Sequence, residues 1–80
     1  MGETQQIIGG RVRAVRESKG LTQEQLSLMV GVSRMSIWRL ENDSENVSVA
    51  CLDKLLDGLG CTIIELLRDD YLEVIVGEKR

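Results

Sequence analysis

Apolar residues recur along most of the chain at the spacing of amphipathic helices. In the segment 7–19, Ile8, Val12 and Val15 lie four and then three positions apart, which places them on one face of a helix. Similar apolar faces occur in four later segments: 22–30, 33–42, 48–59 and 62–68. A glycine, which often ends a helix, directly follows three of the segments: Gly20, Gly31 and Gly60. The pattern predicts an all-α fold of five short helices.

Residues at the starts of these segments are typical helix caps. Thr22 stands three positions before Gln25, and Thr62 stands three positions before Glu65. In such a capping box the threonine hydroxyl accepts a backbone N–H, and the longer side chain reaches back to the cap residue. Serine is the predicted N-cap of two other helices, at Ser33 and Ser48.

The two ends of the chain differ from the helical middle. Residues 1–6 are polar and are predicted to form a flexible lead-in, residues 7–68 the folded domain, and residues 69–80 a C-terminal tail. Residues 71–76 are β-branched and roughly alternating, which predicts a short strand. This strand either pairs with its copy in a second subunit or lies extended on its own domain. The candidate dimerisation strand contains Tyr71, Leu72, Val74, Ile75 and Val76.

Composition removes several classes of function. The chain of 80 residues contains no His, which is the commonest general base and a frequent zinc ligand, so we expect no enzyme, no metal site and no cofactor. No apolar run has the length of a membrane span, and no export signal is recognisable, so a cytoplasmic protein is expected. Cys51 and Cys61 are interpreted as small buried thiols of a reduced cytosol, with a disulfide as the alternative.

Charge is distributed unevenly along the chain. The formal net charge is −3, which argues against a nucleic-acid partner. The first forty residues, however, carry six basic and three acidic side chains, whereas the last forty carry four basic and ten acidic ones. Because a polyanion responds to the local potential and not to the sum, the basic front half is compatible with DNA.

The segment 33–42 has an unusual outward face. If Ile37 and Leu40 point inward, an ideal helix directs four large side chains outward: Arg34, Met35, Trp38 and Arg39. An ordinary solvated face is richer in Glu, Lys and Gln. Two short helices that are joined through one glycine, the second of which presents arginines outward, form the arrangement of a helix-turn-helix motif.

Residues 8–67 resemble the Cro/lambda-repressor-like (XRE) helix-turn-helix domains. The matching stretches are IGGRVRAVR at 8–16, KGLTQEQL at 19–26, GVSRMSIWRLEN at 31–42, NVS at 46–48 and LGCTIIELL at 59–67. The resemblance implies a five-helix lambda-repressor-like fold and a bacterial or phage origin. It also implies a sequence-specific transcriptional regulator, which we expect to be a repressor, that binds double-stranded DNA as a homodimer on a near-palindromic operator.

The resemblance also implies roles for individual residues. Gln23 matches a phosphate contact at the start of the second helix. Arg16 and Glu41 match an ion pair that braces the first helix against the third, and we assign this pair to structure. The positions that reach base edges in the major groove are matched by Arg34, Met35 and Arg39.

Physical chemistry agrees with these roles. The fork of an arginine suits guanine O6 and N7, and Met35 suits a thymine methyl group. Trp38 has three interpretations: it stacks over Arg34, packs on the rim of the fourth helix, or lies against sugar and phosphate. The expected contacts to the DNA backbone are Thr22, Gln23, Ser33, Ser36, Trp38 and Arg11.

Other features favour a second function. The loop 43–47 is acidic where relatives often carry Lys or Arg, so we expect modest DNA affinity with a shallow salt dependence. Leu28 and Met29 stand where relatives often carry charge, and form either an exposed apolar spot for a partner or part of the core. The acidic rear half suits a basic partner, which makes an antitoxin bound to a toxin protein the alternative function.

Overall fold

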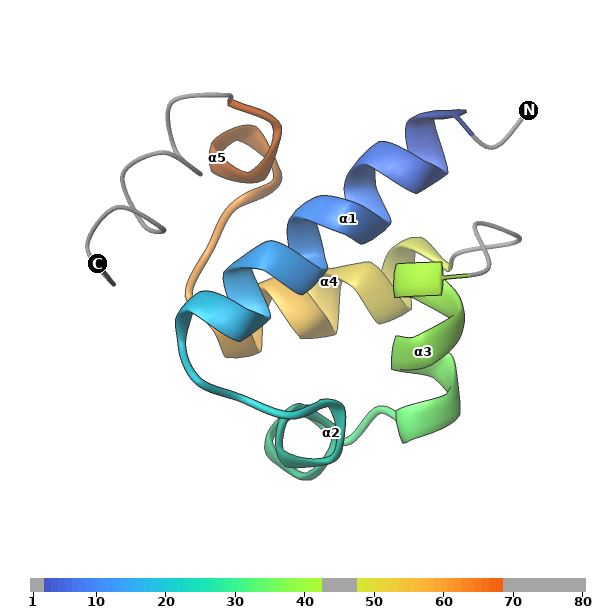
Figure 1. Cartoon of the computed structure of the whole chain (residues 1–80), viewed down its shortest axis with the longest axis vertical. Helices are drawn as coiled ribbons and strands as arrows, with labels where there is room; N and C mark the ends of the chain where they lie inside the picture. The colour runs from blue at the N-terminus through green and yellow to red at the C-terminus, as the bar shows by residue number, and fades with distance from the viewer. Residues whose placement is uncertain (1–2, 43–47, 69–80) are drawn as a thin grey trace.

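The computed structural model describes residues 3–42 and 48–68 of the chain (Figure 1). Within them lie five helices: α1 (Glu3–Ser18), α2 (Gln23–Val30), α3 (Arg34–Asn42), α4 (Val49–Leu59) and α5 (Ile63–Leu67). No described residue forms a strand, and the predicted all-α class is confirmed. No helix among the described residues is both long and apolar enough to cross a membrane. The candidate strand at 71–76, the tail from 69 and the acidic loop 43–47 lie outside the described residues.

The first helix begins at Glu3 and not near residue 7, so the predicted lead-in 1–6 is wrong for residues 3–6. Glu3, Thr4 and Gln6 are exposed polar residues, so these positions give no apolar pattern to detect. The start is nevertheless favourable, because the carboxylate of Glu3 lies near the positive end of the helix dipole and Gln is a good helix former.

The remaining helices begin at the predicted caps. Thr22 Oγ1 accepts the backbone N–H of Gln25 at 3.0 Å, and Gln25 Oε1 accepts the backbone N–H of Thr22 at 2.8 Å. Thr62 and Glu65 repeat this capping box with distances of 3.1 and 3.0 Å. Gly31 ends α2 in the left-handed region with φ of 71°, which only glycine adopts without strain. These local interactions fix where α2 and α5 start and where α2 stops.

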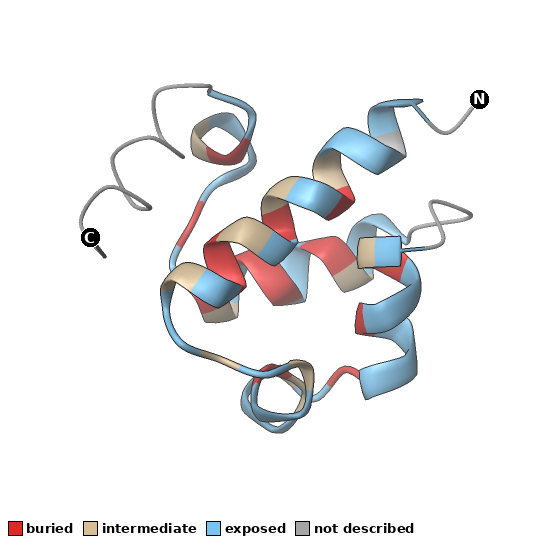
Figure 2. Cartoon of the chain, viewed as in Figure 1, coloured by how far each residue is buried: buried red, intermediate tan, exposed pale blue. Residues whose placement is uncertain are grey.

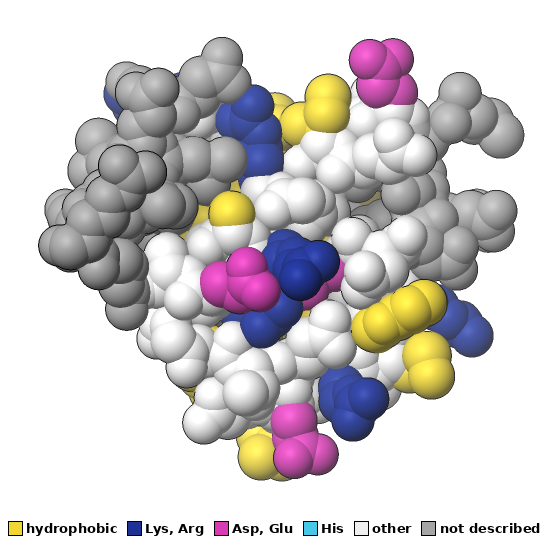
Figure 3. Space-filling view, in the orientation of Figure 1, with side chains coloured by type: hydrophobic (Ala, Val, Ile, Leu, Met, Phe, Trp, Pro, Cys, Tyr) yellow, Lys and Arg dark blue, Asp and Glu magenta, His cyan; other side chains and the backbone are white. Residues whose placement is uncertain are grey.

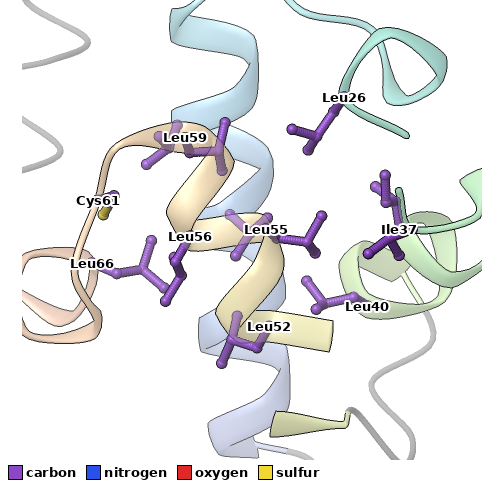
Figure 4. Close-up of a cluster of buried hydrophobic side chains, with 12 residues drawn as sticks. Leu26, Ile37, Leu40, Leu52, Leu55, Leu56, Leu59, Cys61 and Leu66 are labelled. Atoms are coloured by element: carbon purple, nitrogen blue, oxygen red, sulfur yellow. The ribbon is translucent and has the colours of Figure 1, made fainter. Parts of the chain in front are cut away.

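The core is aliphatic, and α4 lies at its centre. α4 contributes four buried leucines, and α1, α2, α3 and α5 contribute the residues that pack around them (Figures 2 and 4). Among the described residues the one aromatic side chain, Trp38, is exposed and takes no part in this core. Its members are Val12, Val15, Leu26, Val32, Ile37, Leu40, Leu52, Leu55, Leu56, Leu59, Cys61 and Leu66.

Two glycines inside helices permit close helix packing. A Cβ atom on Gly9 would overlap the backbone carbonyl oxygen of Leu40, so α1 approaches α3 at this point. A Cβ atom on Gly58 would overlap Cγ1 of Val30, so α4 approaches α2 there. A glycine within a helix costs about 1 kcal/mol relative to alanine, and this close approach of helices gives Gly58 its physical reason.

Cys51 and Cys61 are not joined in a disulfide, as interpreted from the sequence. Cys61 is buried in the core and donates to the carbonyl oxygen of Thr62 at 3.3 Å. Cys51 is partly buried; burial raises the pKa of its thiol, although Lys54 acts in the opposite direction. Cys61 therefore serves packing, and the Cys51 thiol resists ionisation.

Candidate nucleic-acid interface

The two helices of the motif are joined by a three-residue turn that is anchored in the core. Gly31 supplies the left-handed step, Val32 is 9% exposed, and Ser33 precedes the first residue of α3. Leu26 of α2 and Ile37 of α3 are both fully buried. This anchoring fixes the angle between the helices, and one side of α3 faces away from the core (Figures 1 and 2).

The outer face of α3 consists of Arg34, Met35, Trp38 and Arg39, all of which are exposed. Met35 is 58% and Trp38 46% exposed, in contrast to the inward residues of the same helix. Neither arginine makes a hydrogen bond or ion pair with another part of the described chain. Basic and hydrophobic side chains gather here over α3 (Figure 3). The predicted base-reading residues therefore share one accessible surface.

The predicted ion pair between Arg16 and Glu41 is present and buried. Arg16 Nε donates to Glu41 Oε2 at 2.8 Å, and Nη2 donates to Oε1 at 2.9 Å. The two side chains are 8% and 0% exposed. A third donor, Nη1, reaches the carbonyl oxygen of Leu21 at 2.7 Å. The hydrogen bonds to Glu41 raise the pKa of the Arg16 guanidinium, while burial acts in the opposite direction. The pair ties α1, the α1–α2 turn and α3 together.

Gln23 joins the same network from the first turn of α2. Its Nε2 donates to Glu41 Oε1 at 3.1 Å, so Glu41 accepts from two helices at once. A side-chain amide has two N–H donors, and this bond occupies one of them. The predicted phosphate contact is therefore held in a fixed orientation by a buried carboxylate. No local pattern in the sequence indicates this bond, because the partners are separated by 18 positions.

The predicted serine and threonine contacts lie at helix N-termini. Ser33 Oγ accepts the backbone N–H of Ser36 at 3.1 Å and lies 2.9 Å from the Ser36 hydroxyl. Both serines are exposed at the start of α3, and Thr22 is exposed at the start of α2. Free backbone N–H groups and the positive end of the helix dipole make such positions suitable for anions.

Arg11 does not lie with the other predicted backbone contacts. Its Nη1 donates to the carbonyl oxygen of Leu66 at 3.1 Å, which links α1 to the end of α5. The side of α1 that carries Arg11 faces α5, whereas Arg16 lies further along α1 and faces α3. The structure thus gives Arg11 a bracing contact between helices.

Two apolar residues of α2 are also exposed. Leu28 is 82% and Met29 56% exposed, so the interpretation that they belong to the core is wrong. Both follow Leu26, which alone provides the fully buried side chain of this helix. The alternative interpretation, an apolar spot on the surface, agrees with their position.

The proteins similar to this chain include, by name, a control protein, a repressor and an antitoxin. The chain is 34% identical to control protein C.MunI from a Mycoplasma species over 62 residues, which are 76% of this chain and 84% of that protein. It is 29% identical to the immunity repressor protein of Bacillus phage phi105 over 81% of this chain and 45% of the repressor. It is 28% identical to antitoxin PezA of Streptococcus pneumoniae over 82% of this chain and 42% of the antitoxin.

The chain thus spans less than half of the phage repressor and of the pneumococcal antitoxin. No solved structure matches the chain significantly. Residues 12–66, which include the three-residue turn and the whole of α2, α3 and α4, match the helix-turn-helix family model. On this match and on the outer face of α3, the chain belongs to the XRE-type helix-turn-helix family of DNA-binding regulators.

Proposed function

We propose that this chain recognises a specific double-stranded DNA sequence as a transcriptional repressor. The observation that carries the proposal is the outer face of α3, where the guanidinium groups of Arg34, at the start of the helix, and Arg39, in its last turn, have no partner in the described chain. The dimensions of a single helix suit the major groove of B-DNA, so α3 is the recognition helix.

Base reading falls to three residues of the outer face. Arg34 and Arg39 each offer a bidentate fork to guanine O6 and N7, worth about 1–3 kcal/mol of discrimination for a well-formed pair. Met35 lies on the same exposed surface and contacts base edges through its apolar side chain. No cofactor is required for this reading, because every donor belongs to the chain.

Backbone contacts come from the starts of α2 and α3. Gln23 uses the amide N–H that Glu41 does not occupy to bind a phosphate, next to the exposed Thr22. Ser33 and Ser36 serve a second phosphate at the start of α3. These contacts are independent of sequence and set the position of α3 in the groove.

The proposed active form is a homodimer on a near-palindromic operator. Two recognition helices on one side of the duplex require half-sites about 34 Å apart. The apolar alternation at 71–76, outside the described residues, supports a strand shared between subunits, with Tyr71, Leu72, Val74, Ile75 and Val76 as its members. Such a regulator acts in the cytoplasm of a bacterium, at the chromosome or at a phage genome.

In vitro selection of binding sites from randomised duplexes tests this function. We expect a consensus with two guanine-containing half-sites, and a loss of preference at one position when Arg39→Ala replaces wild type. The spacing of the half-sites reports the dimer geometry. Recovery of no consensus, or binding of all sequences by Arg39→Ala and wild type alike, contradicts the proposal.

An antitoxin is the second candidate, and a different observation favours it. Leu28 and Met29 form an exposed apolar spot on α2, and the similar pneumococcal protein is an antitoxin by name. A toxin partner would cover this spot. Purification of the chain with its neighbouring gene product tests this. A stable complex that Leu28→Asp disrupts supports a toxin partner, whereas no complex leaves DNA as the main ligand.

A further inference from the structure

Two large apolar side chains of α3 take no part in the core. Met35 is 58% and Trp38 46% exposed, whereas Ile37 and Leu40 of the same helix are 0% and 2% exposed. The inward residues satisfy the packing of α3 on their own. Exposed apolar surface that the fold does not need commonly marks a contact with a ligand or partner.

The two side chains are neighbours between the arginines. Met35 and Trp38 are three positions apart, so they lie side by side on the helix surface. Arg34 lies one turn before Trp38, and Arg39 borders Met35 on the other side of the outer face. No acidic residue occurs between 34 and 40. Hydrophobic atoms next to basic side chains are visible over α3 in Figure 3. The apolar pair is therefore embedded in a positively charged surface.

This combination fits one apolar group of duplex DNA. The flanking arginines favour a polyanion over a protein with an ordinary surface. Phosphates and most base edges are polar, and the apolar group that the major groove presents is the C5-methyl group of a pyrimidine. A methionine and an indole, both polarisable and only partly hydrated, provide the complementary contact.

We propose that Met35 and Trp38 together bind the C5-methyl group of a pyrimidine that lies beside the guanines read by Arg34 and Arg39. The inference rests on the proposed function, and it names the class of DNA site: one with a C5-methylated pyrimidine in each half-site. Trp38 then becomes a specificity residue, and not the backbone contact that the sequence suggested.

Two bases carry this methyl group. Thymine and 5-methylcytosine present it at the same place in the groove but differ in the neighbouring group, an O4 acceptor against an N4 donor. The methyl contact itself does not distinguish them. The test therefore needs one arm for each base.

The test uses the operator recovered by selection. Each thymine is replaced in turn by deoxyuridine, which removes the methyl group and leaves every hydrogen-bonding group in place. We expect binding to weaken about four-fold at one or two positions in each half-site, equivalent to about 0.8 kcal/mol for one buried methyl group at 1.36 kcal/mol per factor of ten. At the same positions, cytosine and 5-methylcytosine are compared: a gain on methylation adds the methylated base as a ligand, and no gain assigns the site to thymine alone.

Variants connect the methyl group to the two side chains. Met35→Ala and Trp38→Ala are each expected to bring the thymine-to-uracil affinity ratio close to one, while Val49→Ala, which alters an 81% exposed side chain on α4, leaves the ratio unchanged. Both residues of α3 are surface residues, so folding of the variants is expected and is checked by circular dichroism. Trp38 is the chain's one tryptophan, and its fluorescence should respond differently to the thymine and the uracil operator.

The failures of the two proposals are distinguishable. If selection yields no consensus, sequence-specific binding itself fails, and the methyl contact fails with it. If a consensus exists but uracil replaces every thymine without loss, only the methyl contact is overturned. It is also overturned if the thymine-to-uracil ratio of Met35→Ala and of Trp38→Ala equals that of wild type.

Discussion

The guanidinium groups on the two sides of α3 have opposite environments. On the inner side, Arg16 is 7% exposed and directs three donors to Glu41 and to the carbonyl oxygen of Leu21. On the outer side, Arg34 and Arg39 are exposed and make no hydrogen bond within the described chain. The inner group holds the helix in place, and the outer groups remain available to a ligand.

This difference shows why a total charge is a poor guide to function. Of the described arginines, only Arg34 and Arg39 lack an intramolecular partner. The others are engaged: Arg11, Arg13, Arg16 and Arg68. The basic excess of the front half counts Arg16, whose charge is paired with Glu41 inside the fold. The positive potential that α3 presents to a polyanion comes from two side chains, Arg34 and Arg39.

The largest loss of stability is expected from Arg16→Met, which disrupts the buried ion pair on the inner side of α3. The substitution leaves the Glu41 carboxylate, 0% exposed, without its charge partner. We expect a loss of about 3–5 kcal/mol in the free energy of unfolding, measured by urea denaturation. The double variant Arg16→Met with Glu41→Leu should recover most of this loss, because it removes the unpaired charge. A loss below about 1 kcal/mol in the single variant would show that water reaches the carboxylate.

Close packing on the inner side is tested by Gly9→Ala. The new Cβ atom would overlap the carbonyl oxygen of Leu40, and backbone cannot move aside as a side chain does. We expect a loss of about 1–3 kcal/mol in stability, measured by thermal unfolding. Gly10→Ala is the matched control: open space surrounds a Cβ atom at that position, so the better helix propensity should stabilise the protein by up to about 1 kcal/mol. Equal effects of the two variants would refute the close approach of α1 and α3.

Helix bounds could be predicted from the sequence where residues close in the chain determine them. Capping boxes and helix-ending glycines act within a few residues, so the starts of α2 and α5 were predictable. The start of α1 was not, since Glu3 and its neighbours are exposed and carry no apolar pattern. The outward direction of Arg34 and Arg39 followed from helical geometry alone.

Contacts between distant segments were predictable only through the family resemblance or not at all. The Arg16–Glu41 pair came from the resemblance, and the structure confirms it. The bond from Gln23 to Glu41 and the contact of Arg11 with α5 depend on how helices pack, which spacing along the chain does not encode. The close approach of α4 to α2 at Gly58 depends on helix packing in the same way.

Gln23 bonds to the buried Glu41 and also carries a proposed phosphate contact. Its substitution should affect DNA binding more than stability. Gln23→Ala removes the proposed phosphate contact, so affinity should fall about equally for all DNA sequences. The slope of log affinity against log salt should stay nearly constant, since the amide carries no charge and displaces no counterion. Binding to specific and random duplexes over a salt series measures both. A loss confined to the operator would assign Gln23 to base reading.

The smallest effect should come from the ion pair that resembles the buried one in chemistry but not in environment. Arg13 Nε lies 3.3 Å from Glu17 Oε2, and the side chains are 54% and 55% exposed. Water screens this pair, and the order of basic before acidic residue in a helix is the less favourable one. Arg13→Ala should therefore change the free energy of unfolding by no more than about 0.5 kcal/mol, and added salt should shrink even that difference. Urea denaturation at low and high salt, alongside Arg16→Met, measures the contrast. If Arg13→Ala were as harmful as Arg16→Met, burial could not be the reason for the stability of the inner pair, and the distinction between the two sides of α3 would lose its physical basis.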